Sequence, residues 1–181
     1  MITPEETLTK ALSAAREWLT VQTTTASPPR NAVHPSYQTV SNCITVNTDA
    51  SWHSDRLVAG LGWIMDTGQN RASHMAHCYF VSSPLVAEAL AIREAITLCI
   101  KKGFLRVHVK SDSLQLVKAI TSGSSFPEVY GVIADICNIS LAFDCISFSW
   151  IRRENNKDAD ALARQALLNE PFVVATLNVE D

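Results

Sequence analysis

The sequence is poor in cysteine, and its few thiols are scattered. Its 181 residues contain five cysteines, an odd number, and no C-x-x-C pair. Disulfide-stapled folds and zinc sites both need paired or closely spaced cysteines, so the pattern argues against either and favours a reducing compartment. We therefore expect the fold to depend on a hydrophobic core.

Long apolar runs and a basic leader are also missing. No stretch approaches the roughly 20 apolar residues that a membrane span requires, and residues 1–6 carry two acids where a signal or transit peptide would be basic. We interpret the chain as soluble and intracellular, without a membrane or an obligate protein partner. No basic cluster distinguishes nucleus from cytoplasm.

Positive charge is scarce as well. The formal net charge is −3 and the pI is about 5.9, so the chain as a whole lacks the basic footprint of a tight nucleic-acid binder. Residues 119–151 contain no Lys or Arg. Binding to a nucleic acid must therefore depend on a local basic surface. The candidate residues for contacts to phosphates are Lys101, Lys102, Arg106, Lys110, Arg152, Arg153 and Lys157.

What is present is enough apolar sequence for one core of ordinary size, because 47% of the residues are hydrophobic. Residues 1–42 are predicted to form a short amphipathic helix and a flexible linker rich in Thr, Ser and Pro. We place the main domain at residues 43–170 and a loosely held tail at residues 171–181.

The main domain is predicted to mix strands and helices. Ser83 caps and Pro84 opens the most secure helix, which ends near Gly103. The other expected elements are strands at about 43–48, 57–65, 74–81, 105–110 and 144–151, and helices at about 114–120, 128–141 and 156–168. Three sequential strands followed by a strand, helix, strand order indicate an α/β layered domain.

Four acids lie in different predicted elements, and three of them occupy positions where a solvated carboxylate is not the obvious choice. Asp49 is predicted to lie in or at the end of a strand, although an Asp at a strand end also starts a turn. Glu88 falls on or beside the apolar stripe of its helix, although it can also reach water from the helix border.

Asp112 ends a strand that we expect at the sheet centre, where ligands commonly bind, and it also suits a helix N-cap. Asp160 lies inside the last helix, where Asp has poor helix propensity. We interpret its neighbour Asp158 as a solvated side chain. Together the four acids suggest a shared site for Mg²⁺ or Mn²⁺, since matching His and Cys ligands are lacking. Two such ions about 4 Å apart support phosphodiester chemistry.

The four acidic motifs, read together, resemble the type 1 ribonuclease H domain. The motifs are residues 46–51 (VNTDAS), 87–91 (AEALA), 110–113 (KSDS) and 153–163 (RENNKDADALA). More closely, they are similar to the plant branch related to the ribonuclease H segment of non-LTR retroelement reverse transcriptases. The resemblance extends over about residues 43–168, and the order of four motifs is a specific signal.

This resemblance implies a fold, an activity and a site. The fold would be a five-stranded mixed sheet flanked by helices, and Asp49, Glu88, Asp112 and Asp160 would be the catalytic, metal-binding acids. Two Mg²⁺ or Mn²⁺ ions would support endonucleolytic cleavage of the RNA strand of RNA/DNA hybrids, leaving a 5'-phosphate and a 3'-hydroxyl. Selectivity would come from contacts to the 2'-hydroxyl. The candidates for these contacts are Ser51, Ser113 and Asn156.

The chain departs from well-studied bacterial members in three places. It has no His between Trp150 and Asp160, no basic protrusion within residues 119–151, and Ala50 where Gly is common. We expect slow turnover from the first departure and weak, salt-sensitive binding from the second. Two alternatives follow: a weakly active or inactive retroelement-derived module that binds nucleic acid, and a 3'-to-5' exonuclease with the same fold.

Overall fold

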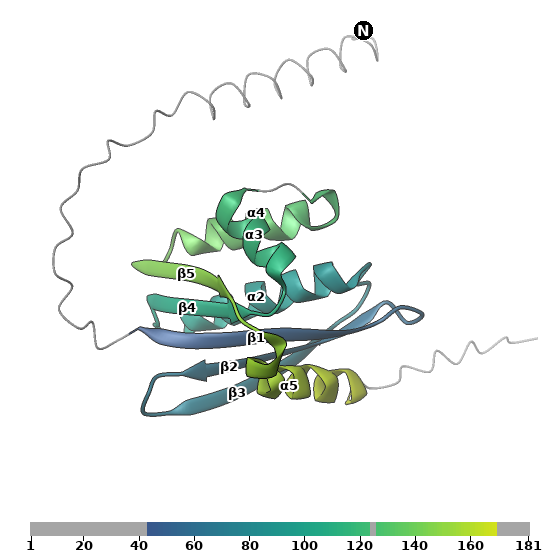
Figure 1. Ribbon diagram of the computed structural model, residues 1–181, viewed down its shortest axis with the longest axis horizontal. Helices are drawn as coiled ribbons and strands as arrows, with labels where there is room; N and C mark the ends of the chain where they lie inside the picture. Colours follow the sequence, from purple (N-terminus) through teal and green to yellow (C-terminus); the bar gives the residue numbers. More distant parts are fainter. Residues whose placement is uncertain (1–42, 124–125, 170–181) are drawn as a thin grey trace, which may run out of the picture. The chain divides into compact units, whose positions relative to one another are not determined.

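The computed structural model describes residues 43–123 and 126–169, which form a mixed sheet with helices on both faces (Figure 1). The helix and linker expected in residues 1–42, and the tail expected in residues 171–181, lie outside the described residues. Among the described helices, none is both long and apolar enough to cross a membrane.

The sheet has five strands in the order β3-β2-β1-β4-β5. They are β1 (Ile44–His53), β2 (Val58–Asp66), β3 (Arg71–Cys78), β4 (Arg106–Ser111) and β5 (Cys145–Trp150). The first three strands pair antiparallel, and β4 lies parallel to both β1 and β5. The expected five-stranded mixed sheet is therefore confirmed.

The third strand begins three residues earlier than predicted and ends before residue 79. Asp66 and Arg71 pair directly, so a tight turn containing Gly68 at a φ of 80° returns the chain at once. Beyond Cys78, Phe80 adopts a φ of 59° and leaves the ladder. The strand predicted at residues 74–81 is therefore displaced by three residues from β3 at both ends.

In the described part of the chain, four α-helices accompany the sheet: α2 (Pro84–Lys101), α3 (Leu114–Ser122), α4 (Tyr130–Ser140) and α5 (Lys157–Leu168). Ser83 caps α2 as predicted, because its hydroxyl accepts a hydrogen bond from the backbone N–H of Val86 at 3.2 Å. The predicted helix at residues 128–141 is split, since Pro127–Val129 forms a 3₁₀ turn before α4. A second 3₁₀ turn, Arg153–Asn155, leads into α5.

Strand β1 is longer than predicted, and this changes the position of Asp49. Asp49 pairs with Gly62 of β2, and the antiparallel ladder continues to His53. On the other side of β1, β4 pairs only as far as Thr48 and Ser111. The interpretation of Asp49 as a turn residue is therefore wrong. Asp49 is the first β1 residue beyond the end of β4, where that side of the strand is open.

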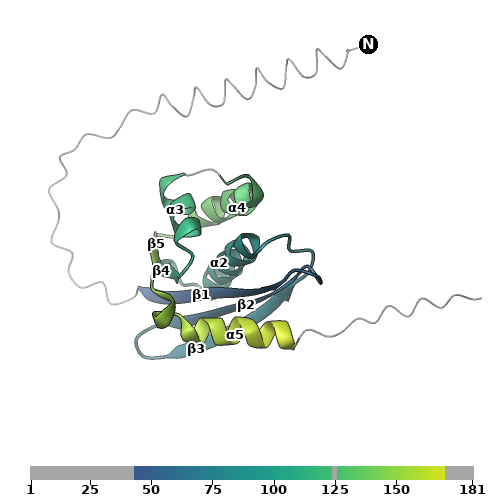
Figure 2. The same cartoon turned by 45° about the vertical axis from the view of Figure 1, so that its right-hand side comes forward.

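Strand β2 is buried along both faces, and the two faces meet different helices. Leu61 belongs to the core cluster that contains Ile92 and Ile96 of α2. Gly62, directed to the other face, approaches the backbone of α5 so closely that a Cβ atom would lie 2.5 Å from the carbonyl oxygen of Ala159. Figure 2 shows α2 and α5 on opposite sides of the sheet.

Candidate metal centre and active site

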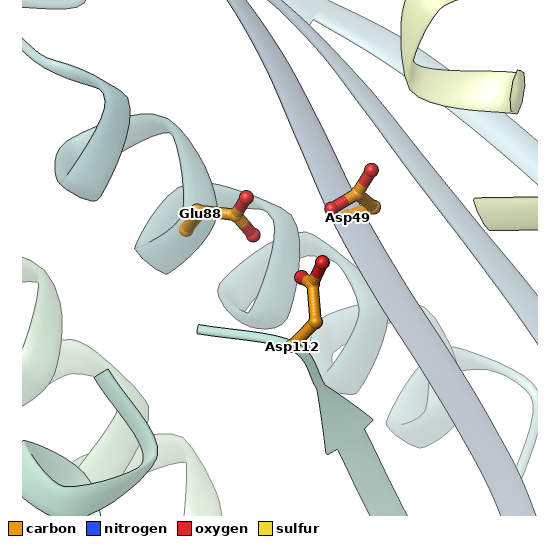
Figure 3. Close-up of side chains that lie close together, drawn as sticks. All are labelled: Asp49, Glu88 and Asp112. Carbon is orange, nitrogen blue, oxygen red and sulfur yellow. The ribbon is translucent and has the colours of Figure 1, made fainter. Parts of the chain in front are cut away.

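Three carboxylates from three separate elements meet beside the open part of β1. Asp49 comes from β1, Glu88 from α2, and Asp112 from the residue after β4. One oxygen of each lies within 4.8 Å of the others, and Figure 3 shows the side chains directed toward a common space. Three negative charges at this spacing repel one another unless a cation or protons compensate them.

The backbone at Asp112 explains why its carboxylate reaches this space. Ser113, not Asp112, occupies the N-cap position of α3, and its N–H donates to the hydroxyl of Ser111 at 3.1 Å. The indole N–H of Trp150 donates to the carbonyl oxygen of Asp112 at 3.0 Å. The end of β4 is thus held from two sides, and the Asp112 carboxylate faces the other acids.

Burial dominates the electrostatics of Asp49 and Glu88. Asp49 is only 3% exposed, and burial, with the nearby charges of Asp112 and Asp160, raises its pKa to about 8. The pKa of Glu88 is also raised, first by burial and then by the charges of Asp49 and Asp112. Both groups are therefore poorly stabilised as anions unless positive charge is supplied.

One oxygen of Glu88 gives a direct test of whether this set of residues fits a cation. Its Oε2 atom is buried and has no hydrogen-bond partner. A buried carboxylate oxygen without a partner is costly, and a metal ion would supply the missing interaction. The cluster offers carboxylate oxygens only, the ligand type that Mg²⁺ and Mn²⁺ prefer. The residues present therefore fit a divalent cation.

Asp160 lies near this cluster but has partners of a different kind. Its charge and a side-chain hydrogen bond contribute to the raised pKa of Asp49, so the two side chains are neighbours. Arg164 contacts both of its oxygens, with Nη2 at 2.9 Å from Oδ2 and Nε at 3.1 Å from Oδ1. Arg153 lies 3.6 Å away. The structure thus places the fourth predicted acid beside Asp49, and two arginine side chains pair with it.

A pocket of about 420 Å³ opens over the three acids. Its lining consists of Asp49, Ser83, Pro84, Leu85, Glu88, Asp112, Ser113, Gln115, Glu128 and Arg153. Sequence reasoning missed Gln115 and Glu128. Gln115 lies three residues after Asp112, a spacing that could have suggested it, whereas nothing in the sequence places Glu128, at the start of the 3₁₀ turn, beside the acids.

The three predicted substrate contacts have different surroundings. Ser113 lines the pocket, and Ser51, half-buried, lies two residues beyond Asp49 on the same face of β1. Asn156 is only 1% exposed, and its amide donates to the carbonyl oxygen of Thr48 at 2.9 Å. Asn156 therefore fastens the start of α5 to β1, and its contact with substrate stays a prediction, as do those of the two serines.

A sequence profile described as reverse transcriptase-like matches residues 47–166, about two thirds of the chain and all four acids. The chain belongs to the reverse transcriptase-like family. No curated protein matches this chain.

Solved ribonuclease H structures share its fold. Ribonuclease H1 of the archaeon Halobacterium salinarum superposes with a TM-score of 0.65 at 22% identity, covering 69% of this chain and 97% of that one. The N-terminal ribonuclease H domain of a Mycobacterium tuberculosis protein gives 0.62 at 19%, covering 69% and 93%. LC11-ribonuclease H1, isolated from compost by a metagenomic approach, gives 0.62 at 26%, covering 69% and 95%. The expected ribonuclease H-like fold is confirmed, and the plant branch stays a prediction.

Proposed function

We propose that this family member is a metal-dependent endonuclease that hydrolyses the RNA strand of RNA/DNA hybrids. The observation that carries the proposal is the convergence of Asp49, Glu88 and Asp112 within 4.8 Å, together with the buried, unpartnered oxygen of Glu88. A carboxylate cluster of this kind at the wall of an open pocket is suited to hold cations against a phosphodiester.

A similar structure supports the choice of substrate. The crystal structure of LC11-ribonuclease H1 in complex with an RNA/DNA hybrid matches this chain with a TM-score of 0.60 at 25% identity, covering 68% of this chain and 95% of that one. That protein binds the hybrid on the same fold. We extend the same substrate class to this chain.

The residues divide the work of the reaction between them. Asp49, Glu88 and Asp112 would hold one divalent ion, and Asp49 with Asp160 would hold a second. When bound, Mg²⁺ or Mn²⁺ supplies activation of the attacking water and stabilisation of the leaving alkoxide. Arg153 lines the pocket and would place its guanidinium beside a phosphate, which is a charge that the acids themselves cannot neutralise.

Selectivity for RNA would come from hydroxyl groups next to the acids. Ser113 lines the pocket, and Ser51 shares a strand face with Asp49. A hydroxyl can donate to and accept from a ribose 2'-hydroxyl, which deoxyribose lacks. We propose that these two serines contact the substrate directly. Asn156 would affect substrate binding by holding the start of α5 against β1.

The deciding experiment measures cleavage of a uniformly labelled RNA/DNA hybrid at low salt. Wild-type protein with Mg²⁺ or Mn²⁺ should yield internal fragments, and Asp49→Asn should reduce the rate by at least about a hundredfold, because it removes a ligand charge from the centre. Arg71→Gln, which breaks an exposed ion pair with Asp158, serves as a control with normal cleavage.

The product pattern separates the alternatives. Stepwise shortening from one end would indicate a 3'-to-5' exonuclease. Absence of cleavage by wild-type protein with either ion, combined with measurable hybrid binding, would indicate a binding module and would overturn the proposed enzyme.

A further inference from the structure

The four acids of the site differ in their counter-ions. Within residues 43–123 and 126–169, Asp49, Glu88 and Asp112 form no salt bridge, whereas Asp160 forms two. Arg164 makes a two-point contact with the Asp160 carboxylate, at 2.9 and 3.1 Å. A two-point guanidinium contact engages both carboxylate oxygens and places a positive charge beside them. Asp160 is therefore compensated before any cation arrives.

Helix geometry keeps this pair together while leaving one partner able to move. Arg164 follows Asp160 by four residues on α5, so the two side chains are neighbours on the helix surface. The side chain of Asp160 is 21% exposed and that of Arg164 is 60% exposed. Since α5 is seated by backbone contact at Gly62, Asp160 stays in place, and Arg164 can turn outward into solvent.

Asp160 also faces a second opening that the three-acid cluster does not line. A pocket of about 460 Å³ is lined by Arg153, Glu154, Lys157 and Asp160. Arg153 lines this pocket and also the pocket over the three acids. A cation at Asp160 would thus meet a region that already carries Arg153, Lys157 and Arg164, whereas a cation at the three-acid cluster would meet chiefly negative charge.

We propose that Arg164 is a built-in counter-cation for Asp160 that competes with a metal ion there and so sets the order in which metal ions bind. The first ion binds to Asp49, Glu88 and Asp112. The second binds between Asp49 and Asp160 only as Arg164 moves away, so its affinity is lower than the acids alone would give. This inference rests on the proposed metal-dependent function and deepens it.

The test counts bound Mn²⁺ on the full chain by electron paramagnetic resonance of the free ion, with Arg164→Gln and Arg164→Lys beside wild type. Wild-type protein should show one tighter and one weaker site. Arg164→Gln should tighten the weaker site roughly fivefold, because one positive charge close to a divalent ion is removed in a solvent-screened region. The tighter site should change by less than about twofold, and Arg164→Lys should stay near wild type since it keeps the charge.

Arg71→Gln is the matched control. Arg71 also pairs with an acid of α5, Asp158, and both side chains are more than half exposed. This variant removes one arginine and one ion pair from the same helix, but away from the acids. Both Mn²⁺ affinities should remain at their wild-type values.

The outcomes distinguish this inference from the function on which it rests. If wild-type protein binds no Mn²⁺ at all, the metal-dependent function itself is overturned, and the inference with it. If wild type binds Mn²⁺ but Arg164→Gln leaves the weaker site unchanged, only the inference fails. A weaker second site in Arg164→Gln would also overturn it, because Arg164 would then orient Asp160 toward the ion instead of competing with it.

Discussion

Helices α2 and α5 each bring one acid to the site from opposite faces of the sheet, but they are seated by different means (Figure 2). Helix α2 packs aliphatic side chains such as Ile92 against Leu61 of β2. Helix α5 places its backbone against Gly62, with the small Ala159 and Ala163 buried beside it. Side-chain packing can adjust to small changes, whereas backbone contact leaves no atoms that can move aside.

The two acids differ in the same way as their helices. Glu88 on α2 has a buried oxygen without a partner, and Asp160 on α5 has two arginines. One face of the sheet therefore supplies a charge that requires a cation, and the other supplies a charge that is already compensated. The two positions of the proposed metal centre would therefore be unequal.

The largest effect should come from breaking the backbone contact of α5. Gly62→Val should lower the free energy of unfolding by more than about 3 kcal/mol, because its side chain would collide with the backbone of Ala159 and Ala163. Urea denaturation followed by circular dichroism would measure it. A midpoint equal to wild type would show that α5 can shift, contrary to the comparison drawn above.

A smaller loss of stability should follow from a substitution on the face of the sheet that α2 covers. Ile92→Ala deletes a fully buried side chain, and we expect a loss of about 2 to 3 kcal/mol from lost burial and a residual cavity. Because neighbouring side chains can partly relax, this variant should remain folded at low temperature and retain hybrid cleavage. Denaturation and cleavage assays on one preparation would check both parts, and loss of cleavage in folded protein would contradict the second.

In metal-free protein, neutralising Glu88 and neutralising Asp160 should change the stability of the fold in opposite directions. Burial raises the folded-state pKa of Glu88, so its protonated form contributes stability that is present at low pH and is lost as pH rises through that pKa. At pH 8 in EDTA, Glu88→Gln should therefore be more stable than wild type by about 1 to 3 kcal/mol. Asp160→Asn, which loses ion pairs with two largely exposed arginines, should lose less than about 1 kcal/mol.

Thermal unfolding at pH 5 and pH 8 would measure this contrast. The advantage of Glu88→Gln should shrink as the pH is lowered from 8 to 5, because the raised pKa of Glu88 favours its protonated form as the pH falls. Saturating Mg²⁺ should raise the wild-type melting temperature at pH 8. A Glu88→Gln variant less stable than wild type at pH 8 in EDTA would contradict the unfavourable burial of the Glu88 carboxylate.

The smallest effect should come from a glycine without close neighbours. Gly131 lies in α4, and a Cβ atom there would meet nothing within 4 Å. Gly131→Ala should raise the free energy of unfolding by about 0.5 to 1 kcal/mol through helix propensity. The same denaturation assay would show a sign opposite to that of Gly62→Val, and a destabilised Gly131→Ala would contradict the role given to the glycine contacts.

Local chemistry in the sequence predicted much of the fold. Ser83 and Pro84 set the start of α2 because a capping hydroxyl and a proline act on their own backbone. The alternation around Val107 and Val109 predicted β4 because burial on one face needs a period of two. These signals depend only on residues that are close in the chain, and so they can be recognised without knowledge of the fold.

The candidate site was predicted less completely, because its geometry depends on contacts between distant segments. The order of the acidic motifs indicated which carboxylates to compare. The pairing of Asp49 with Gly62 was not visible, so the sequence left open whether Asp49 lies inside a strand or at its end. The burial of Asn156 was equally hidden, because its partner, the carbonyl of Thr48, lies 108 residues away in the chain.

The sequence by itself indicated most of the helices and strands and which four acids to compare, because these follow from residue type, local period and the order of the acidic motifs. Only the tertiary structure decided that three of them share a space and that the fourth is paired with Arg164. The physical reason is that charge acts through space. The end of β4 at Ser111 and the glycine seat of α5 set those distances, and neither has a local signature in the chain.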